Sequence, residues 1–130
     1  MSPMRSGILF AGLILAAFPV VAHHSFVMFD TTKQVTLEGT VTNFEWTNPH
    51  AYIEIDVSQA GGGAKHWSVE MGSTSILMKG GWKFSTLKKG DKVTLVLNPL
   101  KDGKPAGLLI SASLADGSKL GNGPGRGPQK

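Results

Sequence analysis

The chain has 130 residues, with 13 lysines and arginines against 9 aspartates and glutamates, and it contains no cysteine. The lack of cysteine excludes a disulfide framework, a thiolate metal site and a thiol nucleophile. The length that remains after an export signal suits one domain with its own hydrophobic core and is too short for two.

Residues 1–22 have the three regions of a secretory signal. Arg5 carries the only side-chain charge, an apolar run covers residues 8–18, and Val20 and Ala22 are the small residues that precede a cleavage site. The apolar run is shorter than the about 20 residues that span a bilayer. We therefore expect cleavage after Ala22, an exported protein, and no membrane span in the mature form. The alternative is an uncleaved anchor.

The first predicted strand covers residues 35–46. Apolar side chains occupy alternate positions from Val35 to Val41, and the alternation then shifts so that Phe44 and Trp46 become the large apolar residues. A shift of this kind predicts a β-bulge or a sharply coiled strand.

Two further strands are predicted over residues 52–57 and 66–71, on either side of three consecutive glycines. Their polar positions predict a hairpin with one wet face: Tyr52, Glu54, Asp56, His66, Ser68 and Glu70. A turn centred on Gly62 places Asp56 opposite His66, whereas a slip of one residue would put the two on opposite faces. We expect a surface ion pair here, or an acid that orients the imidazole as a ligand or base.

A short helix is predicted from Ser73 to Lys79, with Gly80 and Gly81 as its stop. Trp82 follows, in a position to plug one end of a barrel. Two more strands are predicted around residues 93–97 and 108–114. The order predicts an all-β protein, a small five-stranded OB-like Greek-key barrel with one short helix between strands 3 and 4. A small sandwich or an SH3-like barrel is the alternative.

The predicted domain organisation has three parts. Residues 1–22 form the cleaved signal peptide, and residues 23–117 form the single β-barrel domain. Residues 118–130 are rich in glycine and proline, which predicts a disordered tail.

Several spaced elements resemble a family of small exported bacterial proteins of unknown function. These elements are His23-His24-Ser25-Phe26, Trp46-x-Asn48-Pro49-His50-Ala51, Gly81-Trp82 and Leu87-Lys88-x-Gly90-Asp91. The resemblance implies a periplasmic or secreted protein of a Gram-negative bacterium with an OB-like barrel. It brings no activity, substrate or catalytic residue.

The N-terminal histidines suggest a copper site. Cleavage after Ala22 makes His23 the first residue, and its amine and Nδ1 then form a chelate for copper(II). His24 offers a competing chelate through the amine, the amide nitrogen and its own imidazole. His50 or His66 would complete the site. The alternative is that both N-terminal histidines are polar residues of a frayed terminus.

The loop between the first two strands is a common place for a ligand site in OB folds. Pro49 fixes its backbone and presents His50, unless the loop is only a structural turn. With the wet face of the hairpin, this loop provides the predicted ligand-binding residues, which are Trp46, Asn48, His50, Tyr52, Glu54 and Glu70.

We therefore expect a periplasmic or secreted OB-like binding or interaction module, with a small ligand or a periplasmic protein as its partner. The alternative is a copper-binding protein. Enzyme motifs are absent, so neither an activity nor catalytic residues are expected. Nucleic acid is not expected because the wet face is acidic. A basic cluster surrounds the helix and the next turn and suits an anionic membrane, a cell-wall polymer or solvent: Lys79, Lys83, Lys88, Lys89 and Lys92.

Overall fold

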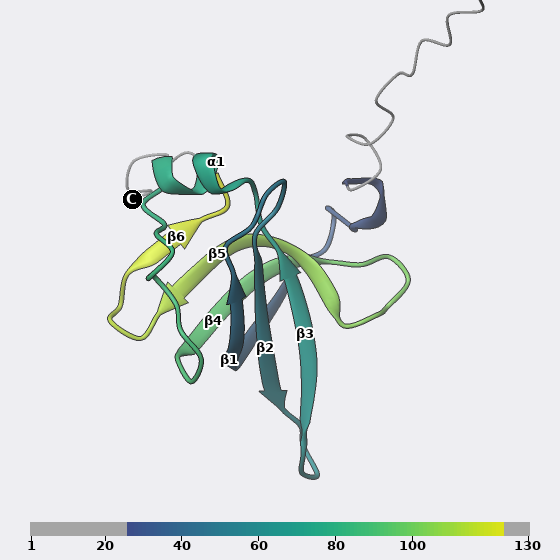
Figure 1. Cartoon of the computed structure of the whole chain (residues 1–130). Coiled ribbons are helices and arrows are strands. Elements are labelled where there is room, and N and C mark those ends of the chain that lie inside the picture. Colours follow the sequence, from purple (N-terminus) through teal and green to yellow (C-terminus); the bar gives the residue numbers. More distant parts are fainter. Residues whose placement is uncertain (1–25, 124–130) are drawn as a thin grey trace, which may run out of the picture.

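The computed structural model describes residues 26–123, which contain six strands and one short α-helix (Figure 1). A 3-10 turn, η1 (Phe26–Met28), precedes them. The elements follow in the order β1 (Val35–Glu45), β2 (Tyr52–Ser58), β3 (Ala64–Glu70), α1 (Thr74–Lys79), β4 (Lys92–Pro99), β5 (Ala106–Leu114) and β6 (Lys119–Gly121).

Five of these strands close into a barrel. The antiparallel order is β3-β2-β1-β4-β5, and β3 then pairs in parallel with β5 through Ser68–Glu70 and Ala106–Leu108. With α1 between β3 and β4, this arrangement confirms the predicted OB-like barrel and its short helix.

Strand β1 is coiled and serves two neighbours. Its first half pairs with β4 and its second half pairs with β2. The register shifts between Val41 and Asn43, which confirms the bulge predicted from the change of alternation. At Gly39 a Cβ atom would lie only 2.9 Å from the carbonyl oxygen of Asp56, so the crossing of β1 and β2 requires glycine.

The core of the barrel consists of aliphatic side chains, Met71 and one large aromatic residue, Trp82. Trp82 is 1% exposed, and the Phe44 ring lies 5.9 Å from it between ring centroids. Trp82 is therefore a core residue, and its predicted place at one end of the barrel stays a prediction. The largest fully buried side chains are Trp82, Ile53, Ile55, Met71, Leu77, Leu95, Leu97, Val41 and Val69.

The predicted disordered tail is wrong for its first residues. Lys119–Gly121 form β6 on β5, and the Trp82 Nε1 donates a hydrogen bond of 2.8 Å to the Gly121 carbonyl oxygen. Leu120 packs against the core, and this contact outweighs the flexible composition around it. Residues 124–130 lie outside the described part of the chain.

The predicted signal, including the expected cleavage site, also lies outside the described residues. Between residues 26 and 123, no helix has both the length and the apolar composition to cross a membrane.

Candidate functional site

The outer face of β2 and β3 gathers the polar side chains that the period-two pattern placed together. The register pairs Asp56 with His66, Glu54 with Ser68, and Tyr52 with Glu70. This register confirms the predicted Asp56–His66 pair. Because alternate residues of a strand share a face, all six side chains project to one side of the hairpin.

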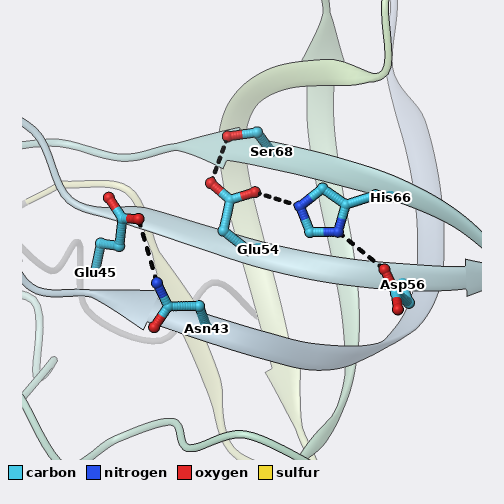
Figure 2. A network of polar contacts seen from close by, with 6 residues as sticks. All are labelled: Asn43, Glu45, Glu54, Asp56, His66 and Ser68. Carbon is cyan, nitrogen blue, oxygen red and sulfur yellow. Dashed lines mark hydrogen bonds and ion pairs between the residues drawn. The ribbon is translucent and has the colours of Figure 1, made fainter.

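His66 lies between two carboxylates (Figure 2). Its Nδ1 is 2.9 Å from Asp56 Oδ1, and its Nε2 is 2.8 Å from Glu54 Oε2. Because both nitrogens face carboxylate oxygens, the imidazolium form can donate to both. The hydrogen bond to Asp56 is the main cause that raises the pKa of His66, burial acts in the opposite direction, and Glu54 adds to the rise.

Glu54 is the centre of this network. Its other oxygen, Oε1, accepts a hydrogen bond of 2.7 Å from Ser68 Oγ (Figure 2). The Glu54 side chain is only 17% exposed, so its carboxylate is held in one orientation by neighbours on β3. The network therefore has a defined geometry instead of consisting of independent surface charges.

The predicted copper site finds no support in the described residues. Across residues 26–123, no group of three or more His, Asp or Glu side chains is arranged to hold a metal ion. His23 and His24 lie outside this range. The two described histidines contact different carboxylates: His50 lies beside Glu70, and His66 lies beside Glu54 and Asp56.

A pocket of about 310 Å³ opens next to this face. It lies where the β1–β2 loop, the end of β3, α1, β5 and the segment after β6 come together. Its lining consists of Pro49, His50, Glu70, Met71, Gly72, Ser73, Ile76, Leu108 and Asn122. Apolar walls with a few polar groups at one side are typical of a small-molecule site.

Glu70 is the charged group of this pocket. Its side chain is 15% exposed, and burial raises the pKa of its carboxyl group, while the charge of His50 acts in the opposite direction. On the neighbouring strand, burial raises the pKa of Tyr52, and the negative charges of Glu70, Glu45 and Glu54 add to the rise. The face beside the pocket thus has a negative potential.

His50 stands at the rim of the pocket. Its Nδ1 is 2.9 Å from the Met71 carbonyl oxygen and 3.3 Å from Glu70 Oε1. The shorter distance makes the Met71 oxygen the acceptor of an Nδ1 proton, so a neutral imidazole keeps Nε2 as an acceptor. The imidazole and the Glu70 carboxylate then both offer acceptors to a ligand.

Two of the predicted ligand-binding residues, Asn48 and Trp46, make structural contacts and do not line the pocket. The Asn48 Oδ1 accepts hydrogen bonds of 3.0 Å from both the backbone N and the Oγ1 of Thr74, which fastens the β1–β2 loop to the start of α1. The Trp46 ring packs 5.6 Å from the Phe44 ring and against the core. The remaining four, His50, Tyr52, Glu54 and Glu70, lie in or beside the pocket and the wet face.

Sequence reasoning did not assign Leu108 and Asn122 to the site. The Asn122 Oδ1 accepts a hydrogen bond of 2.7 Å from Gly72 N, which closes one wall of the pocket. Asn122 lies in the segment predicted to be disordered, and no signal in the sequence marked it. Leu108 was predicted only as an apolar strand residue.

A wider hollow of about 660 Å³ lies beside Gly39, between β1, β2, β4 and β5. None of the residues predicted to bind a ligand lines it. Lys92 and Thr40 both line this hollow, and the Lys92 Nζ donates a hydrogen bond of 2.5 Å to Thr40 Oγ1. The smaller pocket, which combines apolar walls with a buried carboxylate, is the better candidate for a site.

Comparison with known proteins gives one match. A family model described as a family of unknown function (DUF6152) matches residues 11–111, which include β1 to β4 and most of β5. No curated protein and no solved structure matches the chain. The match agrees with the resemblance to a family of unknown function that the sequence elements suggested.

Proposed function

The chain belongs to this family of unknown function, and we propose that it is an exported OB-like module that binds a small ligand. The ligand has a positively charged head group and an apolar body, and the module binds it without chemical conversion. Export rests on the signal-like composition of residues 1–22. The pocket beside Glu70 is the binding site.

The observation that carries this proposal is the buried carboxylate at an apolar pocket. Taking a carboxylate out of water costs free energy unless a cation or hydrogen-bond donor compensates for it. Glu70 is largely buried and has only His50 beside it as an ion-pair partner within the described residues. An ammonium group at the rim would stabilise the Glu70 carboxylate.

The shape of the site supports a small ligand. Pockets for small molecules range from about 300 to 1,000 Å³, and this one, at about 310 Å³, lies at the lower end. Ile76 and Leu108 provide an apolar surface for the body of the ligand. OB folds bind ligands on the β2–β3 face and the adjoining loops, which is where this pocket opens.

The charge of the face supports a cation over an anion. Glu54 and Glu70 are both more than four-fifths buried at their side chains, and they face outward from neighbouring strands. A phosphate backbone would meet these carboxylates and be repelled. Nucleic acid is therefore a poor partner for this face.

Isothermal titration with matched ligands tests the proposal. Primary alkyl amines of four to eight carbons are compared with alcohols and carboxylic acids that have the same carbon chains. We expect the amines to bind best, with affinity that rises with chain length as more apolar surface is buried. Glu70→Gln should weaken amine binding at least about tenfold, which corresponds to the loss of a charge-assisted hydrogen bond.

The matched control is Glu38→Gln, which removes the same charge from an exposed position on β1 and should leave binding unchanged. Equal binding of amines and alcohols, or amine binding that survives in Glu70→Gln, would contradict the proposed cation site.

A further inference from the structure

A second surface of the molecule has the opposite charge. Between Glu70 and Asp91 the chain contains four lysines and no acidic residue. This stretch contains α1 and the connection to β4, which runs along the side of the barrel away from the β2–β3 hairpin (Figure 1). We call six of its exposed residues the basic-apolar edge: Met78, Lys79, Lys83, Phe84, Lys88 and Lys89.

The lysines of this edge are available to an external partner. All four side chains belong to exposed residues, and none forms an ion pair with a carboxylate among residues 26–123. The carboxylate of Asp91, the nearest acid along the chain, accepts a hydrogen bond from the backbone N of Lys88. The positive charge of the edge is therefore not neutralised within the fold.

Two large apolar side chains stand among these lysines. Phe84 is 74% exposed and Met78 is 56% exposed, and each is adjacent in sequence to a lysine. Leu77, Trp82 and Leu87 from the same stretch are buried in the core and anchor it. The exposed apolar groups are thus presented by a fixed backbone, each beside a lysine, which is the pairing of charge and apolar surface found on faces that bind at a membrane interface.

We propose that the basic-apolar edge binds the surface of an anionic phospholipid bilayer. Lysines attract anionic head groups, and phenylalanine and methionine enter the boundary between head groups and acyl chains. An anionic polymer would compensate the lysines but would leave Phe84 and Met78 in water, so a lipid surface matches both properties. The edge and the Glu70 pocket use different residues, so each can be changed without replacing a residue of the other.

Vesicle flotation tests this proposal. Protein recovered after export is mixed with vesicles of phosphatidylcholine alone, or with vesicles that also contain 30% phosphatidylglycerol. We expect binding to the anionic vesicles only. Lys88→Gln/Lys89→Gln should weaken it by about 25-fold, because each lysine near an anionic surface contributes about fivefold. Phe84→Ser should weaken it severalfold without a change of charge.

The control Lys65→Gln/Lys101→Gln removes the same charge from exposed positions on β3 and the β4–β5 loop. It should change binding by less than about twofold. The proposal is overturned if the control weakens binding as much as Lys88→Gln/Lys89→Gln, or if both vesicle types bind equally. Unchanged binding of Phe84→Ser would also overturn it, because that result identifies a purely electrostatic partner. Equal thermal unfolding of all variants verifies that each one is folded.

Discussion

The acidic face of β2 and β3 and the basic-apolar edge differ in how their charges are held. Glu54 is 17% exposed and bonded to both His66 and Ser68, whereas the lysines of the edge are exposed and form no ion pair within residues 26–123. Charges held by neighbours have a defined position and contribute to folding. Charges in solvent act at a distance and contribute mainly to association. The same fold thus provides one surface suited to a specific ligand and one suited to an extended charged partner.

The largest expected effect concerns the core on which both surfaces are built. Trp82, next in sequence to Lys83 of the edge, is buried in this core, and its Nε1 donates a hydrogen bond to the Gly121 carbonyl oxygen. Trp82→Ala should lower the free energy of unfolding by about 3–5 kcal/mol, as measured by urea denaturation. Trp82→Phe keeps most of the packing and removes the hydrogen bond, so it should lower the free energy of unfolding by less than Trp82→Ala does. A loss below about 1 kcal/mol in Trp82→Ala would show that the buried indole contributes little to the stability of the fold.

The comparison itself is tested by removing one charge from the acidic face and two from the edge. Glu54→Ala loses the hydrogen bonds to His66 and Ser68 and should destabilise the fold by about 1–3 kcal/mol. Lys88→Gln/Lys89→Gln should remain within about 0.5 kcal/mol of the wild type. Urea denaturation of the two variants under identical conditions measures both values. If both variants lose a similar free energy of unfolding, the proposed difference between the hydrogen-bonded Glu54 and the solvent-exposed lysines is wrong.

A smaller effect is expected at the pocket wall. Asn122→Ala removes the acceptor for Gly72 N and should cost about 0.5–1.5 kcal/mol. Asn43→Ala is a suitable control, because Asn43 is exposed and its amide makes only a 3.2 Å hydrogen bond to Glu45. Thermal unfolding of both variants gives the comparison. An Asn122 variant as stable as the Asn43 variant would argue against a structural role for the segment after β6.

The smallest effect is the pH dependence of the acidic face. The pKa of His66 in the folded state lies above its ordinary value of 6.5. Its stabilising contribution is therefore fully present below about pH 6.5 and is lost as the pH rises through the folded-state pKa. The wild type should exceed His66→Gln in stability by more at pH 5.5 than at pH 9. Because the side chain is 55% exposed, the change should be about 0–1 kcal/mol.

Urea denaturation at both pH values measures this difference, and an NMR titration of the His66 imidazole measures the folded-state pKa directly. A folded-state pKa at or below 6.5 would contradict the stabilisation of the His66 imidazolium by Asp56 and Glu54.

Properties local to one strand or hairpin could be predicted from the sequence. The alternation of apolar and polar residues placed Asp56 opposite His66, and the change of alternation located the bulge in β1. Both depend on the period of two that any strand imposes on its side chains. The position of Trp82 followed from the glycines before it, which end α1 and turn the chain back to the barrel.

The pocket could not be predicted in the same way. Its wall joins Gly72 to Asn122, which are 50 residues apart, and local alternation contains no information about such a contact. β6 has only three residues, too few to show a pattern. Trp46 is different, because the sequence analysis named it as a ligand-binding residue although it shares its parity with Phe44, and both rings pack against the core.

The parallel pairing of β3 with β5 is the shortest of the ladders that close the barrel, with three residue pairs. Its last pair joins Glu70 to Leu108, and both of these residues line the pocket. Local opening of the barrel should begin at this ladder, where few hydrogen bonds must break, and its amides should exchange with deuterated water sooner than those of the longer ladders. A ligand in the pocket contacts both strands and holds the ladder closed. Slower deuterium uptake at residues 68–70 and 106–108 would therefore report an occupied pocket for any compound in an extract, before the identity of that compound is known.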